Sequence, residues 1–413
     1  MFLSLTFVSF VKIGANWIYF ILIELVFFTV YITKSILLYL IGYNTLYLYS
    51  TIKTFISEKN YLDSLEFVTI CHILILFFLV LFSFLLKNQK IEKVQQRYIS
   101  NRFANRILLI LIGWIICSSI VMYISEVGVM GTTGIRLPYQ LSGILFYSRT
   151  ILLPIVFLYL LEKSIISYNK ILFKNTTAVF VLLAVSEILV RASKGPFLKL
   201  ILLIAFLFVM TFQSGHISKI KISKKKAFTF FMVTLMLFPI IEIYRAISVQ
   251  QLSASSAFEL LFNQNILLIG IEHFFHRLIG FTQLAGIIAM DYSVHGFGFI
   301  SEYGNIARFY TEIYLGYKTE GHLSSPSILG AALIVGGNAY WIFLCIYIFF
   351  MTCCWRLSSF FRCLSLPIKS LLGYELFNTL MAGTVTLTFT RIILYFSIAL
   401  FIEPILRTSL KRN

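Results

Sequence analysis

The chain has 413 residues, of which 59% are hydrophobic and 12% are charged, with a mean hydropathy of +0.90 and a formal net charge of +17. This composition excludes an ordinary soluble domain, because such domains are only about half apolar and about one quarter charged. Apolar runs of about 20 residues, each long enough to cross a bilayer as a helix, recur along the whole sequence. The sequence therefore predicts an all-α fold, a polytopic transmembrane helical bundle that forms a single integral membrane domain over residues 1–413.

The excess of basic residues does not indicate a nucleic-acid-binding protein. The Lys and Arg residues are divided among loops instead of lying on one face, and no nucleic-acid-binding motif is present. The six cysteines lack the spacing of a disulfide scaffold or a metal site. We therefore expect no nucleic acid partner, no metal and no cofactor.

The predicted spans begin near the N-terminus, where MFLSLTFVSFVKIGANW lacks a basic start and a cleavage site and is expected to lead into a retained first helix. Residues 1–52 can hold one long helix or two short ones, so we expect about 10 spans, within a range of 10–12. In chain order the candidate spans are 12–38, 65–86, 107–125, 143–162, 176–190, 196–213, 227–247, 327–350, 370–387 and 390–406.

The basic residues predict how these spans are oriented. One set of alternate connections carries 20 of the 34 Lys and Arg residues, whereas the opposite set carries nine. Because Lys and Arg accumulate in cytoplasmic loops, the first set is expected to be cytoplasmic. It consists of 87–106, 163–175, 214–226, 351–369 and 407–413.

This arrangement leaves 248–326 as a large periplasmic loop between transmembrane spans. Its stretch 257–290, AFELLFNQNILLIGIEHFFHRLIGFTQLAGIIAM, is too apolar for a linker and too interrupted for two spans. We expect it to form short amphipathic or re-entrant helices that lie on the bundle or dip into it. A connection of this length is usually functional when it is ordered.

Several charged residues fall near the outer ends of the predicted spans, against the positive-inside trend. An ionisable group inside a membrane is costly and marks a candidate functional site, although Arg and Lys near helix ends can also extend to the headgroups. Glu187 lies four residues before Arg191 and can pair with it. Cations in this region suit an anionic ligand such as a phosphate or pyrophosphate headgroup. They are Arg149, Arg191, Lys194, Lys199, Arg245 and Arg391.

Acid–base candidates are densest in IEHFFHRLIG (271–280). If this stretch is helical, Glu272 and His276 share one face, while His273 and Arg277 share the next. A carboxylate that holds an imidazole is a common general-base arrangement, and an amphipathic surface helix with incidental polar residues is the alternative. His273 and His276 have no HExxH motif or cysteine partner, which argues against a zinc site.

The layout resembles the Wzy-type O-antigen, or oligosaccharide repeat-unit, polymerases among the GT-C-like membrane glycosyltransferases. The resemblance lies in the number of spans, in the turn RASKGP (191–196), in the one large outer loop, and in ARFYTEIYLGYKTEGHLSSPSILGAALIVGGNAYW (307–341), where the loop enters the next helix. It covers the whole chain in layout, but its local motifs are short.

The resemblance implies an enzyme of the bacterial inner membrane with a periplasmic active face. Such enzymes transfer a growing chain from undecaprenyl pyrophosphate to a new lipid-linked repeat unit and need neither a nucleotide sugar nor a metal. The implied partners are the undecaprenyl-pyrophosphate-linked oligosaccharide, membrane lipid, and the chain-length regulator and flippase of the same pathway.

Residue roles follow from this chemistry and from charge placement. Cations stabilise the charge that develops on the leaving pyrophosphate, and a base takes the proton of the acceptor hydroxyl. His276 or Glu272 is the candidate catalytic base. The candidate pyrophosphate-binding residues are Arg191, Lys194, Arg245, Arg277 and Arg391.

Two other functions are compatible with the sequence. An O-antigen ligase, which delivers the finished glycan to lipid A core, shares this architecture. A flippase for the same lipid-linked unit should show paired halves with broken helices in matching positions, and no internal repeat is evident.

Overall fold

The computed structural model describes a helical protein. It covers most of 21–41, then 57–86, 100–125, 137–191, 195–213, 280–289, 306–314, 326–382 and 385–411, together with isolated residues between 244 and 303. Every regular element in these segments is a helix, and none is a strand. Six of the helical stretches there are long and apolar enough to cross a membrane. The chain is therefore a helical protein with membrane-spanning character, as its composition predicts.

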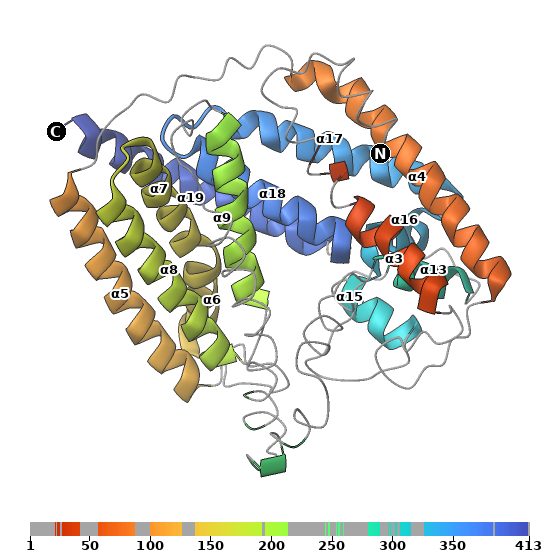
Figure 1. Ribbon diagram of the computed structural model, residues 1–413, viewed down its shortest axis with the longest axis horizontal. Coiled ribbons are helices and arrows are strands. Elements are labelled where there is room, and N and C mark those ends of the chain that lie inside the picture. Colours follow the sequence, from red (N-terminus) through yellow and green to blue (C-terminus); the bar gives the residue numbers. More distant parts are fainter. Residues whose placement is uncertain are drawn as a thin grey trace.

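The helices form two groups with α18 (Ser365–Ala382) between them (Figure 1). The first group begins with α5 (Asn101–Ile124), which packs on α8 (Lys170–Arg191). It continues with α6 (Leu141–Tyr147), the π-helical turn η5 (Ser148–Leu152), α7 (Leu153–Ile166) and α9 (Gly195–Gln213), and α19 (Val385–Lys411) closes it against α18 and η5.

The second group contains η2 (Phe28–Thr33), α3 (Lys34–Ile41), α4 (Glu58–Leu86), α13 (Gly280–Ala289), α16 (Ser327–Gly336) and α17 (Tyr340–Ser358). Its helix α4 packs along α17, and α16 contacts both α17 and α18 (Figure 1). The remaining short elements are η4 (Pro138–Gln140), α15 (Ile306–Phe309), η6 (Tyr310–Tyr314) and η7 (Gly337–Ala339). Because α18 contacts helices of both groups, it connects the two halves of the core.

Basic segments that are far apart in the sequence meet at one end of the bundle. Asn169, in the turn before α8, donates from Nδ2 to Oδ1 of Asn101 at the start of α5, at 2.6 Å. At the start of α18, the backbone N–H groups of residues 362–364 donate to the Glu403 carboxylate of α19 at 2.8–3.2 Å. Glu162, near the end of α7, lies close enough to Glu403 for the two carboxylates to interact. Segments from three of the five connections expected to be cytoplasmic therefore share one end, together with the part of α19 that precedes 407–413.

Seven of the ten predicted spans lie largely on helices α4, α5, α6 to α7, α8, α9, α18 and α19. The span expected at 227–247 falls outside the described residues except for isolated positions, as does the first part of 12–38. The sequence predicts that Glu187 pairs with Arg191, and the structure shows that Glu187 accepts a hydrogen bond from Arg149. The Arg191 side chain lies outside the described part, so its pairing with Glu187 stays a prediction.

The span expected at 327–350 is not one continuous helix. It breaks at Gly337, whose φ of 50° favours glycine, and the break separates α16 from α17. With ten residues, α16 is about 15 Å long and cannot cross a bilayer of about 30 Å by itself. Residues 327–335 of α16 are all buried. Together, α16, η7 and α17 still form a stretch, Ser327–Ser358, that is long and apolar enough to cross a membrane, and α17 is the longer helix of the pair.

Helix α13 comes from the segment expected to form the large outer loop, and it lies inside the bundle. Residues 280–287 are all buried, and α13 packs against α3, α4 and α16. Non-spanning helices are tolerated at membrane depth when protein surrounds them. The structure thus places this part of 248–326 in the core, while the side of the membrane on which the rest lies stays a prediction.

Candidate functional site

A cavity of about 180 Å³ lies between the first helix group and α18, and three cations line it. Arg149 comes from η5, Lys199 from the second turn of α9, and Arg391 from the first turns of α19. This volume slightly exceeds that of an engineered cavity of about 150 Å³ that holds benzene, so a group of phosphate size fits. Glu187 of α8 also lines the cavity, as do Tyr374 of α18 and several apolar side chains.

The cavity lies toward the end of the bundle opposite the basic segments. Arg149, Glu187 and Arg391 are about 12 to 18 residues from Lys163, Asn169 and Glu403 on their helices, which corresponds to roughly 18 to 27 Å at 1.5 Å per residue. Lys199 is near the start of α9, which follows the far end of α8. The three cavity cations therefore lie near the end of the bundle where the positive-inside rule predicts few Lys and Arg residues.

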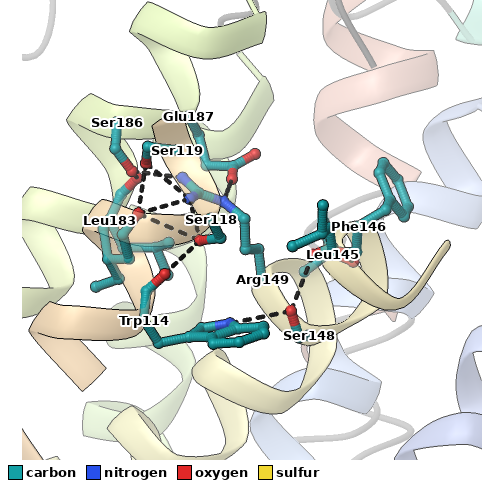
Figure 2. Close-up of polar contacts among 12 residues, drawn as sticks. Trp114, Ser118, Ser119, Leu145, Phe146, Ser148, Arg149, Leu183, Ser186 and Glu187 are labelled. Atoms are coloured by element: carbon teal, nitrogen blue, oxygen red, sulfur yellow. Dashed lines mark hydrogen bonds and ion pairs between the residues drawn. The ribbon is translucent and has the colours of Figure 1, made fainter. Parts of the chain in front are cut away.

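Arg149 is held by α5 and α8 (Figure 2). Its side chain is fully buried, and its Nε donates to Oε1 of Glu187. Its Nη1 donates to Oγ of Ser118 at 2.7 Å and of Ser119 at 2.8 Å, and its Nη2 donates to Oγ of Ser186 at 2.6 Å. Nη1 also lies 3.1 Å from the Ile115 carbonyl. Both ends of the guanidinium are thus engaged by the protein.

The serines can accept these hydrogen bonds because their own protons are used elsewhere. Ser119 donates to the Ile115 carbonyl at 2.6 Å, and Ser186 donates to the Leu183 carbonyl at 2.7 Å. Ser118 donates to backbone carbonyls of the preceding turn in the same way. Each hydroxyl therefore presents oxygen lone pairs to Arg149. This network explains how a fully buried guanidinium is accommodated between two apolar helices.

Lys199 connects η5 to α18. Its Nζ donates to the Thr150 carbonyl at 2.7 Å and lies 5.1 Å from the centre of the Tyr374 ring. The Thr150 carbonyl would ordinarily accept from the N–H four residues later, but residue 154 is proline and has no N–H. The π-helical turn at 148–152 changes the hydrogen bonding of the same stretch, and such turns are frequent at functional sites. The sequence of α7 thus makes an acceptor available for the ammonium.

Arg391 is held by a buried carboxylate on α18. Its Nη1 lies 3.3 Å from Oε2 of Glu375, and 21% of the Arg391 side chain is exposed. Tyr395, one turn later on α19, donates its hydroxyl proton to Oε1 of Glu375. Glu375 is fully buried and does not line the cavity among the described residues. Glu375 therefore holds the Arg391 guanidinium from the side away from the cavity, and Arg391 itself lines the cavity.

Most of the site residues predicted from the sequence lie where no side chain is described. Arg191 is the last residue of α8, and only its backbone belongs to the described part. Lys194, Arg245, Glu272, His276 and Arg277 fall outside the described residues. Arg391 is the predicted site residue whose side chain is described, and it lines the cavity together with Arg149 and Lys199, which the charge pattern also singles out.

Sequence reasoning missed the groups that hold these cations. Glu375, Tyr395, Tyr374 and the serines of α5 and α8 carry no recognisable motif. A carboxylate in the middle of an apolar helix is a signal that could have marked Glu375. The serines give no such signal, because hydroxyls are common in transmembrane helices and bond to their own backbone.

Comparison with known proteins adds no relative: no family model, no curated protein and no solved structure matches this chain.

Proposed function

We propose that this chain is a membrane glycosyltransferase that joins undecaprenyl-pyrophosphate-linked oligosaccharide repeat units, as an O-antigen polymerase does. One observation carries the proposal: three cations from elements far apart in the sequence line one cavity in a helical membrane protein. A buried cation costs free energy, so three cations are not expected to line one cavity by chance. Their presence favours a cavity that binds an anionic ligand. The resemblance in layout to the repeat-unit polymerases supplies the class of substrate.

The proposed chemistry uses the cavity to stabilise a leaving group. When the bond between the sugar and the pyrophosphate breaks, negative charge develops on a phosphate oxygen. Cations already in place in a water-poor site stabilise that charge without reorganising. Lys199 and Arg391 have this role in the proposal, and Arg191, the last residue of α8, keeps the pyrophosphate-binding role predicted from the sequence. Arg245, Lys194 and Arg277 keep the same predicted role.

The position of the cavity supports an extracytoplasmic active face. It lies away from the end where the basic segments meet, and that end is cytoplasmic under the positive-inside rule. An undecaprenyl chain would remain in the lipid beside the helices while its pyrophosphate enters the bundle. The proposal therefore locates the reaction at the periplasmic side of a bacterial inner membrane.

A deletion strain tests the proposal against its alternatives. Polysaccharide from cells that lack the protein is separated on a gel, and a polymerase predicts that a single repeat unit remains on lipid A core while long chains disappear. Complete absence of repeat units from the core would instead indicate a ligase. Repeat units retained on their lipid at the cytoplasmic leaflet would indicate a flippase.

Complementation of this strain tests the cations. Lys199→Gln, Arg391→Gln and Arg191→Ala should each reduce long chains at least about 10-fold, since one lost transition-state contact costs more than about 1.4 kcal/mol. Lys174→Gln and Arg102→Gln remove charges from exposed helix positions and serve as matched controls that should restore long chains. Normal long chains from the Lys199 and Arg391 variants, at matched protein levels in the membrane, would contradict a role of the cavity in the reaction.

A further inference from the structure

The cavity also contains a candidate proton acceptor. Transfer to a sugar hydroxyl needs a base within hydrogen-bond reach of the acceptor. Among the described residues that line the cavity, Glu187 is the carboxylate. We propose that Glu187 takes the proton of the attacking hydroxyl, an assignment that rests on the proposed glycosyltransferase function.

The contacts of the cavity divide it into two walls. The α8 wall carries Glu187 with its partner Arg149, which is bound to α5 and α8. The second wall, from α18 and α19, carries Arg391, held by Glu375 of α18, and Tyr374, which packs against the Lys199 ammonium. A leaving pyrophosphate on the second wall and an acceptor hydroxyl on the first would place the reacting sugar carbon between them.

Glu375 has a different role, although it belongs to the same network. Its two oxygens accept from Tyr395 and Arg391, and its side chain is completely buried behind the cavity. Glu187 is 4% exposed and lines the cavity. Glu375 therefore positions Arg391, whereas Glu187 is placed to contact a substrate.

Arg149 is a positioning residue in this assignment. Its Nε holds Oε1 of Glu187, while three serine hydroxyls and a carbonyl hold its Nη atoms. The guanidinium is thus fixed to the helices and orients the carboxylate, as a third group orients the base in other catalytic arrangements. Rigid support of this kind keeps a base aligned with its substrate.

The proposed step balances without another reactant. The acceptor hydroxyl oxygen bonds to the anomeric carbon as the bond from that carbon to the pyrophosphate oxygen breaks. The electron pair of the broken bond leaves on the pyrophosphate, next to Lys199 and Arg391. The hydroxyl proton passes to Glu187, which later returns it to solvent or to the product phosphate.

A Glu187→Gln variant tests the assignment, because the amide keeps the size of the side chain and an oxygen for Arg149. The purified protein in liposomes is given undecaprenyl-pyrophosphate-linked oligosaccharide extracted from the deletion strain. The variant should bind undecaprenyl pyrophosphate within about 3-fold of the wild type and lose about 10²- to 10⁴-fold in turnover, which is the range of general base catalysis.

The pH profile separates proton transfer from a structural role. A carboxylate base works only when it is deprotonated, so wild-type turnover should fall as the pH drops through the pKa of the base, and the glutamine variant should lack this acid limb. The other charged or titratable groups described at the cavity are Arg149 of η5, Lys199 of α9, Tyr374 of α18 and Arg391 of α19. Glu375→Gln is the matched control, and it should weaken undecaprenyl pyrophosphate binding while the acid limb persists.

Two results would overturn the assignment. Turnover of Glu187→Gln within about 3-fold of wild type would do so, and so would loss of turnover in His276→Ala or Glu272→Gln while Glu187→Gln stays active. If Glu187→Gln does not reach the membrane, Arg149→Leu/Glu187→Leu removes both charges together, and wild-type turnover by that protein would equally reject Glu187. Failure of the wild type to bind undecaprenyl pyrophosphate or to extend chains would reject the proposed function itself.

Discussion

Arg149 illustrates how single side chains decide what a membrane bundle can hold. Its charge is balanced by Glu187, and three serines and one carbonyl accept its Nη protons. The same residue alone in lipid would have to extend toward the headgroups. Here the partners lie on α5 and α8, so the arginine links both helices to the turn that carries it.

Removal of Arg149 should destabilise the fold. Arg149→Leu leaves the Glu187 carboxylate buried without its cation, and a broken buried pair costs about 3–5 kcal/mol. Arg149→Leu/Glu187→Leu should recover most of that loss, because it leaves no unpaired charge. Thermal unfolding in detergent measures the stability of the single and the double variant, and Arg102→Leu serves as the control at an exposed position. A single variant as stable as the wild type would show that the pair contributes little.

At the scale of helices, the contact of α13 with η2 depends on a glycine. A Cβ at Gly280 would lie 2.2 Å from Cγ1 of Val30 and 3.1 Å from the Tyr31 ring. Gly330 on α16 is similar, since its Cβ would lie 2.5 Å from Cδ1 of Ile287 on α13. Small residues let helix backbones approach closely in membranes. These two glycines therefore let the short helices α13 and α16 pack closely in the core.

Gly280→Ala should displace α13 from η2 and cost about 1–3 kcal/mol, the usual effect of overpacking. Val30→Ala removes the Cγ1 atom that the new methyl would meet. Gly280→Ala/Val30→Ala should therefore be more stable than the sum of the single variants predicts. Additive losses in unfolding experiments would mean that the two residues are not coupled.

For the whole molecule, the decisive property is which end of the bundle faces the cytoplasm. The connections richest in Lys and Arg predict the orientation, and several of them meet at one end. The cavity lies toward the other end. The proposed active face thus depends on the positive-inside rule applied to the bundle as one unit.

Cysteine labelling of intact cells tests this orientation. In a cysteine-free background, Tyr139→Cys in η4 should react with a membrane-impermeant maleimide, because Tyr139 is highly exposed at the end of the bundle away from the basic turns. Lys170→Cys, at the basic end, should react only after the membrane is permeabilised. The opposite pattern would put the cavity on the cytoplasmic side.

The sequence was a good guide to the helices and a partial guide to the site. Hydropathy located helices at seven of the ten predicted spans within the described residues, because a lipid-exposed helix must be apolar over its whole length. Within the candidate span Ser327–Ser358 hydropathy did not show the break at Gly337, since a short helix buried in protein has the same composition as one that crosses the bilayer. Charge placement singled out Arg149, Lys199 and Arg391, because an ionisable residue within an apolar run is rare and costly.

Composition and charge by themselves determined that this is a helical membrane protein with cations near one side of its predicted spans. These properties come from the free energy of placing each residue in lipid, which depends on that residue and its near neighbours in sequence. Only the tertiary structure decided that Arg149, Lys199 and Arg391 line one cavity. It also placed Glu187 in the lining and made Glu375 the buried partner of Arg391. Such contacts join residues about 10 to 240 positions apart, and they depend on how helices pack instead of on any local pattern.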